Sequence, residues 1–205
     1  MDAKNHWENV YSQKKPDEVS WYKPHLDLSL DMLAHAGLKP SSHIIDVGAG
    51  ASTLVDDLIK LGVKAVTVFD VSGEALAVSK ARLGNQASEV EWNEADITQA
   101  KLRKEYYDIW HDRAVFHFLT DAQDRRRYVT TMTNALKPEG QLVIATFSLK
   151  GPARCSGLDV VRYSPETLQV ELGNGFHLVE SLEEEHGTPF NTVQQFTYCR
   201  FQRVR

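Results

Sequence analysis

An acidic residue followed by two glycines is spaced in this chain as in sites that hold a nucleotide-like cofactor. Asp46 lies near the end of the predicted strand of residues 42–47, Gly48 and Gly50 follow it, and a helix-forming run covers residues 53–61. Glycine is needed where the backbone adopts a positive φ or a ligand comes close, and a helix start offers free N–H groups. Strand, glycine turn and helix together predict a cofactor site. The alternative is a buried strand with a surface acid.

The residues around the glycines favour a cationic ligand over a dinucleotide. A dinucleotide fingerprint has a third small residue three positions after the second glycine, where this chain has Thr53. The carboxylate of Asp46 would repel a pyrophosphate, whereas it suits the α-ammonium group of S-adenosylmethionine. We therefore expect S-adenosylmethionine as the cofactor, with S-adenosylhomocysteine as the product, and an NAD-dependent oxidoreductase is the alternative.

Two further acids follow the next strands. Asp70 ends the run of residues 65–70, 20 residues after Gly50, where a carboxylate can accept hydrogen bonds from both hydroxyls of a ribose. Asp96 could accept from the adenine amino group, with Ile97 packing on the ring. The alternatives are a helix cap or a solvated loop for Asp70, and a cap of the following short helix for Asp96.

Residues 110–118 combine ionisable and large apolar side chains. His111, Arg113 and His117 lie at the predicted carboxyl end of a central strand, where open α/β sheets bind ligands. We expect them to be catalytic, with a histidine as base if the acceptor must lose a proton. His186 is a weaker candidate base. Alternatively, His117 is a satisfied histidine on an apolar turn, and Asp112 pairs with Arg113.

The acceptor is indicated by loop residues. Trp21 and Tyr22 lie between prolines in an irregular segment, and they form either a plug over a core edge or a lid whose aromatic faces suit a sulfonium cation. Arg113, Arg154 and Arg162 follow predicted strands and hint at an anionic or polar small acceptor. The nearby Cys155 could bind a soft substrate, although a lone loop cysteine is usually unremarkable.

Alternating elements predict a doubly wound α/β fold. Helical patterns cover residues 4–14, 26–36, 53–61, 73–83, 120–136 and 164–172, and buried strands are expected at 42–47, 65–70, 90–93, 106–110 and 141–147. Thr120 and Gln123 form a capping-box pattern at the start of the long helix, and residues 137–140 are expected to end that helix. Residues 176–182 and 194–202 alternate with period two and predict an antiparallel hairpin at the sheet edge.

Composition limits the possible classes of function. The 205 residues suit one domain, and a net charge of −5 gives no basic footprint for nucleic acid. No apolar run approaches the roughly 20 residues that span a bilayer, and residues 1–10 do not resemble a signal peptide. Two cysteines fit a reducing compartment. No metal-binding cluster is evident. We expect a cytoplasmic protein, monomeric or weakly dimeric, with no membrane or nucleic-acid partner.

These motifs together resemble a known family. The order Asp46-Val47-Gly48-Ala49-Gly50, Asp70, Ala95-Asp96 and Leu136-Lys137-Pro138-Glu139-Gly140 is similar to that of the seven-stranded class I S-adenosylmethionine-dependent methyltransferases. The resemblance implies a mostly parallel sheet of order 3-2-1-4-5-7-6, with helices on both faces and an antiparallel edge strand. It also implies a core of residues 41–205, on which residues 1–40 pack as a helical lid.

The resemblance implies roles for particular residues. The turn from Asp46 holds the methionine end, Asp70 the ribose, and Asp96 with Ile97 the adenine. The expected cofactor-binding set is Trp21, Tyr22, Asp46, Gly48, Ala49, Gly50, Ser52, Asp70, Val71, Ala95, Asp96, Ile97 and His111.

The resemblance also bears on the acceptor. The N-terminal aromatic residues are similar to those of a branch of small-molecule and lysine methyltransferases with an aspartate-lysine-glycine motif, which is Asp112-Arg113-Ala114 here. We expect a small-molecule acceptor of thiol, metalloid or carboxylate type. A protein lysine methyltransferase and a non-catalytic cofactor-binding protein are the alternatives.

Overall fold

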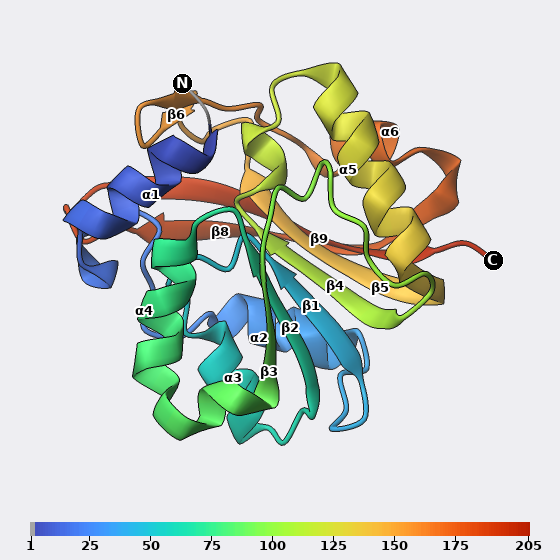
Figure 1. The fold of residues 1–205 in the computed structure, drawn as a ribbon. Helices are drawn as coiled ribbons and strands as arrows, with labels where there is room; N and C mark the ends of the chain where they lie inside the picture. The colour runs from blue at the N-terminus through green and yellow to red at the C-terminus, as the bar shows by residue number, and fades with distance from the viewer. Residues whose placement is uncertain (1–2) are drawn as a thin grey trace.

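A mixed β-sheet forms the centre of the computed structural model, which describes residues 3–205 (Figure 1). Within those residues the main sheet has seven strands in the order β3-β2-β1-β4-β5-β9-β8, parallel from β3 to β5 and antiparallel in the last two. The strands are β1 (His43–Val47), β2 (Ala65–Asp70), β3 (Val90–Glu94), β4 (Tyr107–Arg113), β5 (Leu136–Phe147), β8 (Phe176–Gly187) and β9 (Val193–Arg203). A separate small ribbon pairs β6 (Arg154–Cys155) with β7 (Leu158–Asp159). The doubly wound fold, the strand order and the antiparallel edge are confirmed.

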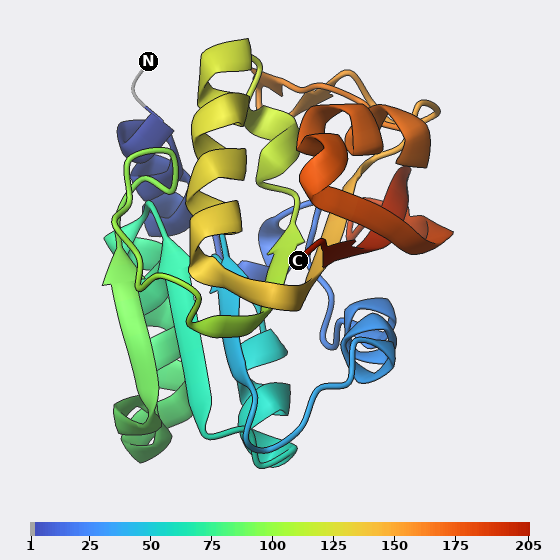
Figure 2. The same cartoon turned by 90° about the vertical axis from the view of Figure 1, so that its right-hand side faces the viewer.

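Helices cover both faces of this sheet (Figures 1 and 2). One face packs against α2, α3 and α4, and the other against α5 and α6, so that each face has its own apolar core. The helices are α1 (Ala3–Gln13), α2 (Asp27–His35), α3 (Leu54–Lys60), α4 (Gly73–Leu83), α5 (Ala122–Ala135) and α6 (Pro165–Leu172), with 3₁₀ turns η1 (Pro16–Glu18), η2 (Gly84–Glu89), η3 (Phe116–Phe118) and η4 (Gly173–Gly175). None of these helices is long and apolar enough to cross a membrane.

The first helix, α1, packs beside α4 at the carboxyl ends of the strands (Figure 1). The Glu8 carboxylate accepts hydrogen bonds from the backbone N–H groups of Gly73 and Glu74 and from the Ser72 hydroxyl, at 2.9–3.1 Å. Burial opposes ionisation of Glu8, but these hydrogen bonds lower its pKa overall. An anion at the positive end of a helix is favourable, and it attaches α1 to the core.

Strand β4 is longer than the sequence predicts. The prediction ended it at residue 110, whereas the strand continues to Arg113. Strand residues alternate between the two faces of a sheet, which places His111 and Arg113 on the face covered by α2. Asp112 points to the opposite face, where it accepts hydrogen bonds from Val115 N–H, Phe116 N–H and the Tyr128 hydroxyl. The predicted pairing of Asp112 with Arg113 is therefore wrong.

Two details around α5 also differ from prediction. The helix begins at Ala122, and its cap is Asp121, whose carboxylate accepts from Gln123 N–H at 2.6 Å, so the predicted Thr120 cap is wrong. The helix ends at Ala135, and β5 begins at Leu136 without an intervening break. Residues 137–140 belong to β5 as an irregular stretch, because the register with β4 shifts there.

Candidate active site

A cavity of about 330 Å³ opens at the carboxyl ends of β1, β2 and β4. Its floor is the glycine turn, and one wall is the loop after β3. Its roof is the N-terminal cover, a name used here for residues 3–26, which contribute Ala3, Trp7, Tyr11, Pro16, Val19, Trp21, Tyr22, Lys23 and Leu26. This is the position at which open α/β sheets bind ligands.

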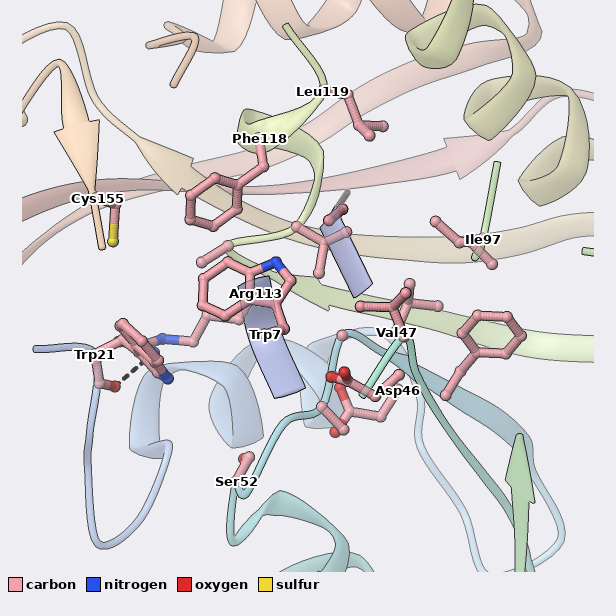
Figure 3. A pocket seen from close by; sticks show the side chains of 18 of the residues that line it. Trp7, Trp21, Asp46, Val47, Ser52, Ile97, Arg113, Phe118, Leu119 and Cys155 are labelled. Carbon is pink, nitrogen blue, oxygen red and sulfur yellow. Dashed lines mark hydrogen bonds between the residues drawn. The ribbon is translucent and has the colours of Figure 1, made fainter. Parts of the chain in front are cut away.

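Most of the residues predicted to form the site line this cavity. The lining includes Trp21, Tyr22, Asp46, Gly48, Ala49, Ser52, Asp70, Val71, Ala95, Asp96, Ile97, His111 and Arg113. Gly50 and His117 are not among the lining residues. In Figure 3 the cavity extends from Ile97 and Asp46 at one end to Trp21 and Cys155 at the other.

The two glycines of the turn are required by geometry. Both have positive φ, 63° at Gly48 and 55° at Gly50. A Cβ atom on Gly48 would lie 1.8 Å from Cγ2 of Val115, and one on Gly50 would lie 2.2 Å from the Tyr11 hydroxyl. Gly50 acts through its backbone, because its N–H donates to Oδ2 of Asp70 at 2.7 Å.

Asp70 joins the two loops that border the cavity. Its second oxygen, Oδ1, accepts from Ser72 N–H at 2.8 Å. Burial raises the pKa of Asp70 to about 6, and the negative charge of Asp46 adds to the effect, although the backbone hydrogen bonds favour the ionised form. The carboxylate therefore titrates close to neutral pH at the place where we predicted a ribose.

Asp96 acts in part as the predicted alternative, a cap for the segment that follows it. Its carboxylate accepts from the backbone N–H and the hydroxyl of Thr98, both at 2.8 Å, and from the Gln99 side chain. It therefore caps the turn that follows β3. Asp96 nevertheless lines the cavity, and buried Ile97 lies beside it.

His111 is completely engaged by its neighbours. Its Nδ1 lies 2.7 Å from Oδ1 of Asp46, and its Nε2 lies 3.0 Å from the Ser29 hydroxyl. Since both ring nitrogens already have partners, neither is available to take a proton from an acceptor. The geometry makes His111 a support for Asp46 and does not favour the predicted role as a base.

His117 does not reach the cavity. Its Nδ1 accepts the backbone N–H of Phe147 at 3.1 Å. Burial, assisted by the charge of Arg113, lowers the pKa of His117 to about 3. The ring is neutral and packs between Phe118 and Phe147. This arrangement matches in part the alternative of a histidine satisfied inside an apolar turn, because Nδ1 has a partner and the buried Nε2 has none. It argues against the predicted role as a catalytic base.

Arg113 holds the N-terminal cover. Its Nη1 donates to the carbonyl of Trp21 at 3.0 Å, the interaction drawn as a dashed line in Figure 3. Its Nε donates to the Tyr198 hydroxyl at 2.9 Å, and its Nη2 lies 3.9 Å from a carboxylate oxygen of Glu184. The guanidinium also lies over the Phe196 ring, 4.8 Å from its centroid.

Sequence reasoning missed an aromatic cluster at the acceptor end. Trp7 contacts Trp21 and Phe118 with ring centroids 5.6 and 5.1 Å apart, and Tyr11 lies 6.4 Å from Trp21. Phe147 and Phe196 also line this end of the cavity. The spacing of Trp7 and Tyr11, one helical turn apart on an amphipathic helix, was the available signal.

Of the other residues predicted to contact the acceptor or act on it, most lie outside the cavity and one, Cys155, lines it. The guanidinium of Arg154 donates to Gly157 O, and that of Arg162 donates to Leu149 O; neither residue lines the cavity. His186 hydrogen-bonds to Ser20 O and is likewise outside the lining. Cys155 does line it, and burial raises the pKa of its thiol to about 11, so it is uncharged.

Comparison with known proteins agrees with this geometry. Residues 45–144 match the family described as "Methyltransferase domain". The mouse "eEF1A lysine and N-terminal methyltransferase" is 23% identical over 121 residues, which are 58% of this chain but 17% of that protein, so the chain spans about a sixth of that relative. The bovine protein of the same name is also 23% identical, with the same 17% covered.

Solved structures share the fold over nearly the whole chain. A protein from a study of the conversion of a disulfide bond into a thioacetal group during echinomycin biosynthesis superposes with a TM-score of 0.78 at 20% identity, covering 98% of this chain and 93% of its own. The N-methyltransferase NodS from Bradyrhizobium japonicum, solved with S-adenosylhomocysteine, has a TM-score of 0.71 at 19% identity, with 98% and 100% covered.

The strand order and these structural matches show the class I, Rossmann-like methyltransferase fold. The methyltransferase domain family matches residues 45–144, just under half of the chain, and NodS, which shares the fold, is an N-methyltransferase solved with S-adenosylhomocysteine.

Proposed function

We propose that this enzyme methylates a small-molecule acceptor of thiol, metalloid or carboxylate type. One observation carries the proposal: the cavity has three acids, Asp46, Asp70 and Asp96, along its cofactor side and an enclosed aromatic cluster at its other end. The space beyond the acids is covered by α1 and by residues 19–26. A small molecule fits such an enclosed space better than a folded protein surface does.

The cofactor end fits S-adenosylmethionine residue by residue. Asp46 would hold the ammonium group, Asp70 the ribose hydroxyls, and Asp96 with Ile97 the adenine. A Cβ at Gly48 or Gly50 would collide with a neighbour, so glycine at both positions allows the turn to take the conformation that borders this end of the cavity. Residues 1–40 would act as the lid and residues 41–205 as the core.

The protein's own part in the reaction is positioning. Bound here, S-adenosylmethionine supplies a methyl group already activated by its sulfonium charge. Trp21 and Phe118 would shape the acceptor end and exclude water from it. The aromatic faces of Trp7 and Trp21 also suit a neighbouring cation. Because His111 is engaged and His117 is outside the cavity, we propose that the acceptor reaches its reactive form without a histidine base.

A protein or peptide amine is the second candidate acceptor. The curated relatives carry the name eEF1A lysine and N-terminal methyltransferase, and NodS is an N-methyltransferase. Asp121 and Asp124 also lie on the cavity wall, where acids favour a cationic group. The enclosed cavity, and Arg113 and Ala114 in place of the lysine and glycine of the lysine-methyltransferase motif, favour the small molecule.

A labelled-methyl screen separates these candidates. Purified protein is incubated with S-adenosylmethionine carrying a labelled methyl group and either thiols, selenite, tellurite and carboxylic acids, or lysine and N-terminal peptides. The proposal expects label only in the first set, and label in the peptides would overturn it. Calorimetry with S-adenosylhomocysteine and NAD tests the two remaining alternatives, since a silent binding protein binds the former without turnover and an oxidoreductase binds the latter.

Compartment and assembly are proposed from composition. Cys155 and Cys199 are both free and buried, which fits a reducing environment such as the cytoplasm. We propose a monomer or weak homodimer with no nucleic-acid partner, because the net charge is −5. Light scattering coupled to size-exclusion chromatography measures the mass in solution, and a stable tetramer would contradict the proposal.

A further inference from the structure

Buried polar side chains line up on the face of the sheet that α2 covers. Asp46 on β1 lies opposite His111 on β4, and Arg113 follows two residues later on the same face. Tyr198 on β9 reaches this face from across β5. Ser29 on α2 packs against them, and Ser29, His111 and Tyr198 are each at most 1% exposed.

These side chains form a continuous chain of polar groups from Arg113 to Asp46. Nε of Arg113 donates to the Tyr198 hydroxyl at 2.9 Å, and the Ser29 side chain adjoins that hydroxyl. The Ser29 hydroxyl lies 3.0 Å from Nε2 of His111, whose Nδ1 lies 2.7 Å from Oδ1 of Asp46. A guanidinium can only donate and a carboxylate can only accept. With His111 protonated on Nδ1 alone, its Nε2 accepts from Ser29, and the donors then point from Arg113 toward Asp46.

The chain connects the two parts of the site that must act together. At one end Asp46 lines the cavity and uses Oδ1 for His111, which leaves Oδ2 for a ligand. At the other end Arg113 donates to the Trp21 carbonyl and lies near Glu184, which itself pairs with Lys23. Trp21 and Lys23 belong to the N-terminal cover.

We propose that Ser29 and Tyr198 are positioning residues through which an ammonium group bound at Asp46 holds the N-terminal cover closed. The proposal rests on the proposed function, because it takes that ammonium group from the methionine portion of the cofactor. A cation bound to Asp46 restricts the orientation of its carboxylate. Through His111 and the hydroxyls of Ser29 and Tyr198, it also restricts the Arg113 guanidinium that holds Trp21. Hydrogen bonds in a buried chain strengthen one another, so the loss of one hydroxyl should loosen both ends.

Two ligands separate this role from a merely structural one. S-adenosylhomocysteine carries the amino-acid portion, whereas 5′-methylthioadenosine has the same nucleoside and lacks that portion. Tyr198→Phe and Ser29→Ala each remove one hydroxyl from the chain. By calorimetry we expect each variant to bind S-adenosylhomocysteine about fivefold to twentyfold more weakly, with the affinity for 5′-methylthioadenosine changed by less than about twofold.

A matched control and a second readout complete the test. Tyr107→Phe also removes one buried hydroxyl, which contacts Thr67 outside the chain, and it should leave both affinities unchanged. Hydrogen exchange of residues 19–26 at saturating S-adenosylhomocysteine should be slow in the wild type and faster in the Tyr198→Phe and Ser29→Ala variants.

The possible outcomes are distinct. Equal weakening of both ligands, or unchanged exchange in residues 19–26, would overturn the proposal and leave the chain as part of the core. If the wild-type protein binds neither ligand, the proposed function fails first. If Tyr198→Phe does not fold, Ser29→Ala and His111→Asn carry the same comparison.

Discussion

Cofactor affinity should depend on pH through Asp70. Burial raises the pKa of this carboxyl to about 6 in the unliganded protein. Ribose hydroxyls donate to the ionised form, so binding is coupled to loss of the proton. Affinity for S-adenosylhomocysteine should therefore rise as the pH increases from 5 to 8.

The expected size follows from the pKa. With a pKa of about 6, about one tenth of the Asp70 carboxyls are ionised at pH 5, so affinity there should be about tenfold lower than at pH 8, or about 1.4 kcal/mol. The pH dependence of folding stability has the opposite sign to that of cofactor affinity. Because the pKa is raised on folding, Asp70 favours the folded state fully below pH 4, and that contribution, about 3 kcal/mol, is lost as the pH rises through 6.

Titration calorimetry across this pH range measures the effect. Asp70→Asn removes the titrating group and should flatten the pH dependence as well as weaken binding. Asp112→Asn is the matched control, since burial also raises the pKa of Asp112 to about 6 on the far face of the sheet. That variant should alter the pH dependence of stability and leave that of binding intact. Equal wild-type affinity at pH 5 and pH 8 would refute the reasoning.

Three further substitutions probe the turn, the cover and the excluded base. Gly48→Ala should abolish S-adenosylhomocysteine binding, because the new Cβ would lie 1.8 Å from Val115. Gly62 also has a positive φ but faces open space, so Gly62→Ala is the control. It should lower the free energy of unfolding, measured with denaturant, by only about 1 kcal/mol and leave binding intact. Glu8→Ala should free α1 from α4, costing about 1 kcal/mol, with faster hydrogen exchange in residues 3–13; unchanged exchange would contradict this role. His117→Asn should leave the pH–rate profile between pH 5 and 8 unchanged, because the pKa of His117 is already about 3; a lost inflexion there would restore it as a base.

Local signals in the sequence were sufficient for most of the fold. The β-branched run of residues 65–70 and the Ser72 cap predicted β2 and α4 with their observed bounds. The predicted strand β4 ended too early because His111, Asp112 and Arg113 resemble a polar loop in the sequence. Their buried partners come from distant residues such as Ser29 and Tyr198, which local patterns do not reveal.

The part of the candidate site that could be predicted is the part formed by residues at the carboxyl ends of strands. Asp46 and Asp70 follow from strand ends, so both were found. The aromatic cluster depends on how α1 folds back over the core, held by Glu8 at a helix start more than 60 residues away. Arg154 was misplaced for a different reason, since its own loop turns its side chain back toward Gly157 and Asp159.

A crystal structure with S-adenosylhomocysteine tests the central claim most directly. We expect the ligand's ammonium group on Asp46, its ribose hydroxyls on Asp70 and its adenine between Asp96 and Ile97, with Trp21 closed over the sulfur. S-adenosylhomocysteine bound outside this cavity, or bound in it with the adenine toward Cys155, would contradict the account.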